Sequence, residues 1–307
     1  MTAPKSAGQI KPLWSTGGFH NPECGIVDHR VGQIYLSCMA SDSSVAAAGR
    51  GYISRLSLSG EVLEKQWIGG LKVPCGITVR ESRLFVVDCD RLLVFDTRSA
   101  RQVAEYPAPG AVFLDGMAVD ETGDNVFVSD IAGNAIWKLE GNEWGCWLSS
   151  PLLDFPDGMI AEPHRLVVGT HGIWKGVRQF RPGATPDHKG HLIAIDYESK
   201  EITDIGAGSP IAHHDGLTTD GADGYITSDF VYNCLIHVTN SGAVTPLLRF
   251  DAMDDNLAPA VRTEYCELAA EHGRSGGPAD IRYDAKTGLL LVPFVDAGKL
   301  SAFSYVR

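Results

Sequence analysis

The sequence predicts an all-β protein, a six-bladed β-propeller with four-stranded blades, and three observations support this. Apolar residues come in short bursts of four to seven, broken by Gly, Asp, Asn and Pro, which is typical of strands and turns rather than helices. A short phrase with an acid or a cysteine at a fixed place recurs six times. Its copies are 40 to 65 residues apart, which suits one propeller blade with its loops.

The six copies of this phrase mark the expected start of each blade. They read N-P-E-C-G-I (21–26), V-P-C-G-I (73–77), F-L-D-G-M (113–117), F-P-D-G-M (155–159), H-H-D-G-L (213–217) and G-P-A-D-I (277–281). Each unit continues as strand, turn, strand, turn and strand, and residues 116–139 align with residues 216–239 in this way. Such sheets cannot bury both faces alone, so we expect them to stack radially around a channel.

The sixth unit has room for only three strands before residue 307. We expect residues 9–16 to close the ring as the outer strand of the last blade, giving one propeller domain over residues 1–307. Blades are expected to start near residues 23, 75, 115, 157, 215 and 280. Two long loops, 170–191 and 251–277, interrupt the pattern, and the second contains a predicted short helix at 260–272.

Composition excludes several classes of partner. A net charge of −12 argues against binding to nucleic acid or an anionic membrane, because phosphates would be repelled. No apolar run reaches the roughly 18 residues that a membrane-spanning helix needs, and residues 1–12 lack the apolar centre of a secretory signal. The seven cysteines are scattered without a C-x-x-C pair. We therefore expect a reduced, cytoplasmic protein that acts on a small molecule, as a monomer or small homo-oligomer.

Five of the six copies carry an acid at the same place, namely Glu23, Asp115, Asp157, Asp215 and Asp280. For any single copy the simpler interpretation is a turn residue, and Asp280, in the weakest copy, fits that interpretation best. On a closed ring, however, the five would converge on the channel and repel one another unless protons or a cation neutralise them. Hard oxygen ligands favour Ca²⁺, with Mg²⁺, Mn²⁺ or Zn²⁺ as alternatives. The sequence thus predicts one divalent metal ion held by Glu23, Asp157, Asp215 and Asp115.

A second set of polar residues ends the second strand of most units. These are Asp88, Asp130, Thr170 with His171, and Asp229. Such aspartates usually cap turn amides, whereas a neutral His171 could serve as a base or as a substrate donor. Of the adjacent His213 and His214, one should face the channel and the other the blade interior. The motifs of serine-nucleophile and dinucleotide enzymes are absent from the sequence.

The P-E-C-G opening followed by D-x-R-x-G-x-I-Y-L-S resembles the start of the SMP-30/gluconolactonase/LRE family, and the L-D-G, P-D-G-M and H-D-G-L phrases resemble its later strand starts. The resemblance implies a divalent ion in the propeller channel, with Glu23 in the glutamate role and Asp215 in the aspartate role of ligand and base. Asp115 and Asp157 stand where the family has asparagines, so the site is more anionic. The family's early-blade substrate arginine has no counterpart here.

The leading hypothesis is a metal-dependent hydrolase that opens a lactone or similar cyclic ester. The ion would polarise the carbonyl group, and Asp215, Asp157, Asp115 or His171 would deprotonate the attacking water. His214 and the basic loop 170–191, with Trp174, Arg178 and Arg181, would bind the substrate and attract an anionic one. Two alternatives stay open: a lyase, hydratase or isomerase on the same metal site, and a non-enzymatic propeller that serves as a binding scaffold.

Overall fold

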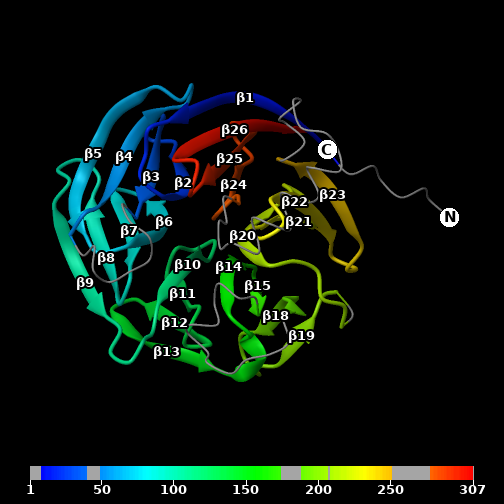
Figure 1. The fold of residues 1–307 in the computed structure, drawn as a ribbon. Coiled ribbons are helices and arrows are strands. Elements are labelled where there is room, and N and C mark those ends of the chain that lie inside the picture. Colours follow the sequence, from blue (N-terminus) through cyan, green and yellow to red (C-terminus); the bar gives the residue numbers. More distant parts are fainter. Residues whose placement is uncertain (1–7, 40–48, 174–187, 207, 251–276, 307) are drawn as a thin grey trace.

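The computed structural model describes residues 8–39, 49–173, 188–206, 208–250 and 277–306. Over these residues the chain forms six four-stranded antiparallel sheets arranged in a ring around a central channel (Figure 1). The sheets follow one another in sequence order, and the first strand of each lies nearest the centre of the ring. The predicted all-β, six-bladed propeller is confirmed.

The blades are numbered here from the first sheet in the chain. Blade 1 contains β2 (Pro22–Asp28), β3 (Gln33–Cys38), β4 (Gly51–Ser57) and β5 (Val62–Leu71). Blade 2 contains β6 (Pro74–Arg80), β7 (Arg83–Asp88), β8 (Arg91–Asp96) and β9 (Gln102–Pro107). Blade 3 contains β10 (Leu114–Val119), β11 (Asn125–Asp130), β12 (Ala135–Glu140) and β13 (Glu143–Ser149).

The second half of the ring repeats this order. Blade 4 contains β14 (Pro156–Ala161), β15 (Arg165–Thr170), β18 (Leu192–Asp196) and β19 (Ile202–Asp204), with a two-stranded ribbon of β16 (Gly172–Ile173) and β17 (His188–Lys189) beside it. Blade 5 contains β20 (His214–Thr219), β21 (Gly224–Asp229), β22 (Cys234–Thr239) and β23 (Val244–Arg249). Blade 6 contains β24 (Arg282–Asp284), β25 (Leu289–Phe294), β26 (Lys299–Val306) and β1 (Gln9–Gly17).

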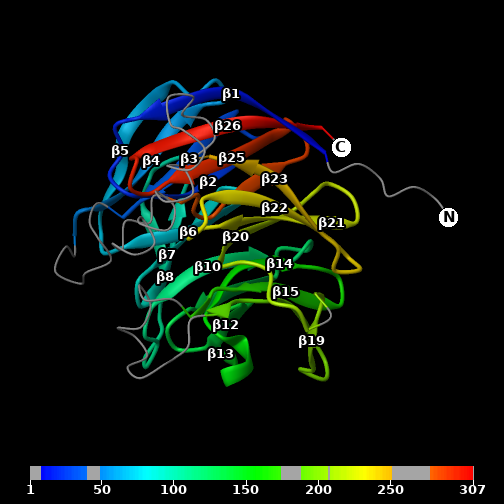
Figure 2. The ribbon, with the colours of Figure 1, turned by 45° about the vertical axis from the view of Figure 1, so that its right-hand side comes forward.

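The ring is closed by the strand nearest the N-terminus. β1 pairs antiparallel with β26, from Gln9 opposite Val306 to Gly17 opposite Lys299. Both views show β1 lying along the outside of β26 (Figures 1 and 2). The predicted closure of the last blade by residues 9–16 is therefore confirmed.

The hydrophobic core is divided into clusters that lie between adjacent blades. One cluster joins Leu36 of blade 1 to Leu291 and Leu300 of blade 6, and five more occupy the other junctions around the ring. Because each sheet packs a face against both neighbours, alternate residues of the strands are buried on both sides. The blades thus form one continuous wall around the channel.

The described residues contain only a short 3-10 turn, Pro151–Leu153, and no α-helix. The helix predicted at 260–272 lies outside them. No helix in the described part of the chain has the length and apolar character needed to cross a bilayer.

Candidate functional site in the propeller channel

The first strand of five blades is irregular at the acid position. The pairing with the second strand shifts register between Pro22 and Gly25 in blade 1, and the equivalent shift recurs in blades 2 to 5. A bulge of this kind interrupts the strict alternation of side chains and can redirect one of them. The recurring phrase therefore encodes a repeated bulge at the start of the first strand.

The glycines of the phrase let neighbouring first strands approach one another. A Cβ atom added at Gly116 would lie 2.4 Å from the carbonyl oxygen of Asp157, and one added at Gly158 would lie 2.3 Å from that of Asp215. A Cβ atom added at Gly76 would likewise lie 2.6 Å from the carbonyl oxygen of Asp115. These distances leave no room for any larger residue. In blades 2 to 4 the glycine of the phrase thus packs against the backbone of the acid residue in the next blade.

The five acids lie close enough to influence one another's charge. Glu23, Asp157, Asp215 and Asp280 are buried, and Asp115 is partly buried. Burial raises the pKa of Asp157 well above its usual range, and the charges of Asp115, Asp215, Glu23 and Asp280 raise it further. The pKa of Glu23 is raised by burial first and then by Asp215, Asp115 and Asp280.

The charges of these carboxyls therefore cannot all be present without compensation. Burial raises the pKa of Asp215, and the charges of Asp115 and Asp280 add to this. For Asp115 burial is again the first cause, and its pKa is raised to about 7. Like charges that share a low-dielectric space favour bound protons or a bound cation.

Asp280 differs from the other four because it has a cationic partner. Nη2 of Arg282 lies 2.8 Å from the Asp280 carboxylate and donates to it, and it also donates to the carbonyl oxygen of Met117 at 2.8 Å. Nη1 of Arg282 donates to the carbonyl oxygen of Leu217 at 3.3 Å. These partners belong to blades 6, 3 and 5, so the Arg282 side chain crosses the channel. Among the ion pairs of the described residues, none involves Glu23, Asp115, Asp157 or Asp215.

Sequence reasoning missed Arg282, although it stands two residues after Asp280 in D-I-R. Residues at this spacing on an extended chain point to the same side, and an arginine there was a detectable signal. The pKa of Asp280 is raised by burial while Arg282 acts in the opposite direction. Asp280 is therefore best understood as half of a buried ion pair.

The donor chemistry of the remaining acids fits a hard divalent cation, but their side chains are not gathered as ligands. The described residues contain no cluster of three or more His, Cys, Asp or Glu side chains arranged to hold an ion. Oδ1 of Asp215 is buried and has no hydrogen-bond partner among the described residues, as expected for an oxygen that can accept a cation. Binding of an ion would require rotation of carboxylate side chains within the same backbone.

The aspartates at the ends of the second strands accept hydrogen bonds from backbone amides of the loops. Oδ1 of Asp88 accepts from the Val73 amide at 2.8 Å, and Oδ1 of Asp130 accepts from the Phe113 amide at 2.9 Å. Oδ1 of Asp229 accepts from the Tyr232 amide at 2.9 Å. These contacts agree with the capping interpretation and explain why buried carboxylates are present at these strand ends.

The three histidines of the site lie at the junction of blades 4 and 5. The rings of His171 and His213 are 5.4 Å apart, and Nδ1 of His213 donates to the carbonyl oxygen of His171 at 2.8 Å. His214 is fully buried, with Nδ1 2.8 Å from Oγ1 of Thr227. Burial lowers the pKa of His171 to about 3 and that of His214 to about 3, with further lowering by His213. Both imidazoles are therefore neutral at pH 7.

His213 and His214 have different surroundings. His213 stacks on Tyr232 at 5.9 Å, whereas the fully buried His214 packs against Gly169 of blade 4, where an added Cβ would lie 2.8 Å from the His214 Cβ. The substrate contact predicted for His214 would thus need a ligand between blades 4 and 5. Trp174, Arg178 and Arg181, predicted to bind substrate, lie outside the described residues.

Two thiols, Cys24 and Cys75, adjoin the acids. Both side chains are fully buried. Burial raises the pKa of each thiol well above its usual range, and the nearby charges of Asp280 and Asp115, respectively, add to this effect. Neutral buried thiols of this kind fill space and are poor nucleophiles.

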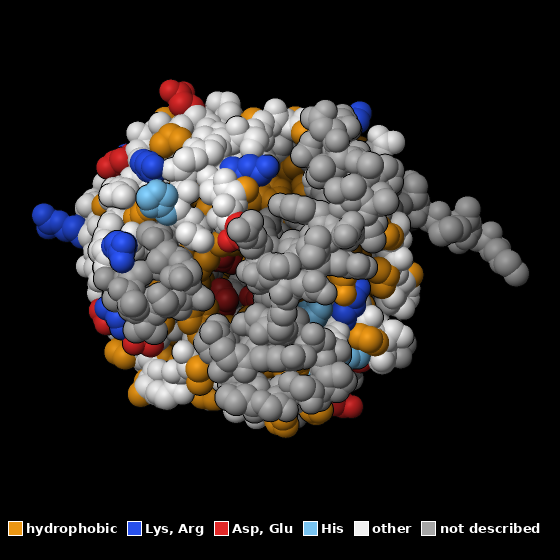
Figure 3. All heavy atoms as spheres, in the orientation of Figure 1, with side chains coloured by type: hydrophobic (Ala, Val, Ile, Leu, Met, Phe, Trp, Pro, Cys, Tyr) orange, Lys and Arg blue, Asp and Glu red, His pale blue; other side chains and the backbone are white. Residues whose placement is uncertain are grey.

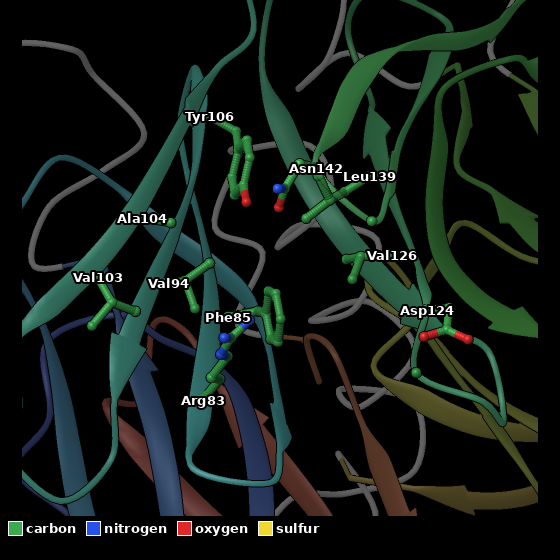
Figure 4. Close-up of a pocket in the computed structure, with 12 residues that line it drawn as sticks. Arg83, Phe85, Val94, Val103, Ala104, Tyr106, Asp124, Val126, Leu139 and Asn142 are labelled. Atoms are coloured by element: carbon green, nitrogen blue, oxygen red, sulfur yellow. The ribbon is translucent and has the colours of Figure 1, made fainter.

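Figure 3 shows acidic atoms deep in a hollow at the centre of the ring, with hydrophobic side chains beside them. A separate pocket of about 400 Å³ lies between blades 2 and 3, and its apolar wall includes Phe85, Val126 and Leu139 (Figure 4). Arg83 and Asp124 are its charged residues. None of the five acids lines this pocket, so it is distinct from the hollow at the centre of the ring.

Comparison with known proteins finds solved structures that share the architecture of this chain. A structure of virginiamycin B lyase from Staphylococcus aureus is 15% identical, with a TM-score of 0.61 over 96% of this chain and 99% of that one. A streptogramin B lyase is 12% identical, with a TM-score of 0.56 over 97% of this chain and 98% of that one. The fold is that of these propellers.

Another propeller-like match is a protein of unknown function from Bacteroides thetaiotaomicron, 11% identical, with a TM-score of 0.63 over 97% of this chain and 76% of that one. No family model and no curated protein matches the sequence. Because all three identities are low, the likeness establishes the propeller fold alone. Membership of the SMP-30/gluconolactonase/LRE family is not shown.

Proposed function

We propose that this propeller is a metal-dependent hydrolase that opens a lactone or a similar cyclic ester. The observation that carries the proposal is a set of four carboxyls, the buried Glu23, Asp157 and Asp215 and the partly buried Asp115. Their pKa values are all raised, and none of them is paired with a cation among the described residues. Such a set is costly to keep in a fold unless it binds something positive.

Glu23, Asp157 and Asp215 would hold the ion, with Asp115 as a fourth ligand or as a base. A divalent ion bound there would supply Lewis-acid polarisation of a carbonyl oxygen. The oxygen-only donor set favours Ca²⁺, followed by Mg²⁺ and Mn²⁺. The Arg282–Asp280 pair stays outside this set because its charges already balance.

The general base is better assigned to a carboxylate than to His171. A base works best when its pKa lies near the working pH. Burial raises the pKa of Asp115 to about 7, whereas burial lowers the pKa of His171 to about 3. Asp115 or Asp215 would therefore take the proton from water, and the neutral His171 would orient the substrate through a hydrogen bond.

Metal analysis of the purified protein tests the proposal. We expect about one divalent ion per chain, an increase in melting temperature when Ca²⁺, Mg²⁺, Mn²⁺ or Zn²⁺ is added after chelation, and lactone hydrolysis that depends on the same ion. Glu23→Gln combined with Asp215→Asn should abolish both binding and activity, while the exposed Glu198→Gln should change neither. Retention of the ion by the double variant would contradict the assignment.

A lyase acting at the same site is the second candidate. It is supported by the neutral His171, whose ring lies 5.4 Å from that of His213, and by the architectural likeness to proteins described as virginiamycin B lyase and streptogramin B lyase. A neutral imidazole can remove a proton from carbon as well as from water. Product analysis in ¹⁸O-labelled water separates the two reactions, because hydrolysis incorporates label and elimination does not.

A further inference from the structure

A ring of residues surrounds the channel just outside the acids, and we call it the channel collar. It has two members per blade: the residue two positions before the acid position, and the residue that directly follows the second strand. The first row contains Asn21, Val73, Phe113, Phe155, His213 and Pro278, and the second row contains Met39, Cys89, Ile131, His171, Phe230 and Val295.

The two rows are joined by backbone hydrogen bonds. The amide of Ile131 donates to the carbonyl oxygen of Phe113 at 3.0 Å, and that of Phe230 donates to the carbonyl oxygen of His213 at 3.1 Å. Blades 1 and 4 make the same bond, at 2.9 and 2.7 Å. The ladder between the first two strands therefore continues beyond the bulge. A ligand that reaches the acids from this face of the ring must pass the collar.

Most of the collar is apolar, and its side chains pack on one another. Two hydrophobic clusters contain nearly all of its apolar members, and together they draw on every blade. Phe113 of blade 3 and Phe230 of blade 5 belong to both clusters. These two rings are only partly buried, so they still present surface to a ligand. Hydrophobic atoms are visible beside the deep acidic atoms in the central hollow (Figure 3).

Two of the three polar members of the collar lie together. His171 and His213 adjoin each other at the junction of blades 4 and 5, and the Nζ of Lys189 lies 4.5 Å from the ring centre of Tyr232, which stacks on His213. The third polar member is Asn21 of blade 1. The collar thus has an apolar arc over blades 6, 2 and 3, interrupted only by Asn21, and a mixed side at blades 4 and 5, where the two histidines lie beside Phe155 and Phe230.

The apolar arc is held in place by buried charges. Asp88 is 0% exposed and binds the Val73 amide, and Asp130 is 2% exposed and binds the Phe113 amide. A charged hydrogen bond to a loop amide is strong, so the loops that carry these apolar residues are fixed. A fixed apolar wall favours the binding of apolar groups, because they lose no hydrogen bonds when they leave water. It disfavours the binding of hydroxyl groups, which lose hydrogen bonds to water and find no partner at the wall.

We propose that the channel collar binds an alkyl chain or an aromatic ring of the substrate, so that the substrate is a lipophilic cyclic ester and not a polyhydroxylated sugar lactone. This inference rests on the proposed function for the identity of the reacting group. The apolar part of the substrate lies against Phe113 and Phe230. Its ester oxygens face His171, His213 and the acids.

The test is a chain-length series assayed with the cation that stabilises the protein. The substrates are γ-butyrolactone, γ-octalactone and γ-dodecalactone, with D-glucono-1,5-lactone as the polar comparison. We expect kcat/KM to increase about fourfold for each added methylene until the collar is filled, and the sugar lactone to be the poorest substrate. Equal or faster hydrolysis of γ-butyrolactone or the sugar lactone would overturn the inference while leaving the hydrolase assignment intact.

Variants of the two phenylalanines make the test specific to the collar. Phe113→Ala and Phe230→Ala should each reduce kcat/KM for γ-dodecalactone about tenfold and leave γ-butyrolactone nearly unchanged, and Phe113→Leu should restore most of the loss. Val103→Ala, at a side chain 55% exposed on β9, is the control and should change neither. An equal loss for both substrates would show that the phenylalanines support the fold rather than the ligand.

Binding measured without turnover separates the two proposals. Calorimetric titration of γ-dodecalactone into the Glu23→Gln/Asp215→Asn variant should show binding that Phe113→Ala weakens about tenfold. If no lactone is hydrolysed by the unaltered protein but this binding is present, the hydrolase proposal fails and the ligand class stands. If γ-dodecalactone neither binds nor reacts, the inference about the collar is wrong.

Discussion

Arg282 and Asp280 form a buried ion pair at the centre of the ring, with 2.8 Å between Nη2 and the carboxylate oxygen. The side chains are 16% and 5% exposed. The same guanidinium also binds the carbonyl oxygens of Met117 and Leu217, so it links three blades. The pair therefore divides the five channel acids into one that is compensated by a cation and four that have no cationic partner within the described part of the chain.

Removing the cation of this pair should destabilise the fold strongly. Arg282→Met leaves the Asp280 carboxylate buried without its partner, which typically costs about 3–5 kcal/mol in the free energy of unfolding. Urea denaturation followed by fluorescence measures the loss. Adding Asp280→Asn should recover part of it, because the unpaired charge is then gone. Arg55→Met, at the exposed pair with Glu64, should cost less than about 1 kcal/mol.

Cation removal should lower the stability of the protein. An ion that binds only the folded state stabilises it by about 2.7 kcal/mol at a concentration 100 times its dissociation constant. The melting temperature should therefore fall on treatment with EDTA and increase with the logarithm of added Ca²⁺. A melting temperature that is independent of Ca²⁺, Mg²⁺, Mn²⁺ and Zn²⁺ would argue against any ion in the channel.

Asp229 should make stability decrease as the pH rises. Burial raises the pKa of Asp229 to about 6, compared with about 3.9 in an unfolded chain. The folded state thus holds a proton more tightly between these values, so stability is greatest below about pH 4 and declines until the pH passes 6. Asp229→Asn removes this dependence while keeping an oxygen for the Tyr232 amide. We expect the variant to gain up to about 3 kcal/mol at pH 8 and nothing at pH 4.

Thermal denaturation at pH 4, 6 and 8 checks the sign of this effect. Asp196→Asn is an opposite control, because hydrogen bonds from the Ser199 amide and hydroxyl lower the pKa of the exposed Asp196. Its contribution is present above the unfolded pKa and lost as the pH falls. The Asp196 variant should therefore be less stable than the parent at pH 8, and a gain there would contradict a lowered pKa of Asp196.

Buried neutral His171 should have the opposite influence to Asp229. Burial lowers the pKa of His171 to about 3, so the unfolded chain binds the additional proton between pH 6.5 and 3. Stability from this group is complete above about pH 6.5 and declines by up to about 1.4 kcal/mol per pH unit below it. His171→Gln should reduce the acid sensitivity measured between pH 7 and 4.5. An unchanged pH profile would show that His171 is accessible to protons in the folded state.

The glycines next to the acids should resist substitution. Gly116→Ala places a Cβ 2.4 Å from the carbonyl oxygen of Asp157, a backbone atom that can move only with its strand. We expect a loss of about 1 to 3 kcal/mol in unfolding free energy together with a weaker effect of added cation on the melting temperature. Gly145→Ala, on β13 with nothing within 4 Å, is the matched control and should be nearly neutral.

The repeat made most of the fold predictable. The number of blades could be predicted from the positions and spacing of the six phrases. The ring closure could be predicted from the additional strand at residues 9–16, because both features depend on strand patterning. The convergence of Glu23, Asp115, Asp157 and Asp215 followed from the same symmetry. These features are set by the backbone, and each unit carries the same information.

The individual side-chain roles were less predictable. The orientation of His213 and His214 depends on a bulge at which the alternation of strand side chains breaks down. Whether carboxylates converge on an ion depends on their rotamers, which a sequence pattern does not encode. The apolar members of the collar do not stand out in the sequence, because they lie two positions before and fourteen to sixteen positions after the acid positions.

The pairing of residues 9–17 with residues 299–306 sets a condition on folding during synthesis. Five blades can form as the chain emerges from the ribosome, but blade 6 has an unpaired outer edge on β26 until the two ends of the chain meet. This contact has the largest sequence separation of all the described strand pairs and so the highest loop-closure entropy among them. Until it forms, strand β1 is available to pair with the β26 edge of another nascent chain. Crowded synthesis would therefore favour exchanged dimers, in which each ring is completed by its neighbour's strand.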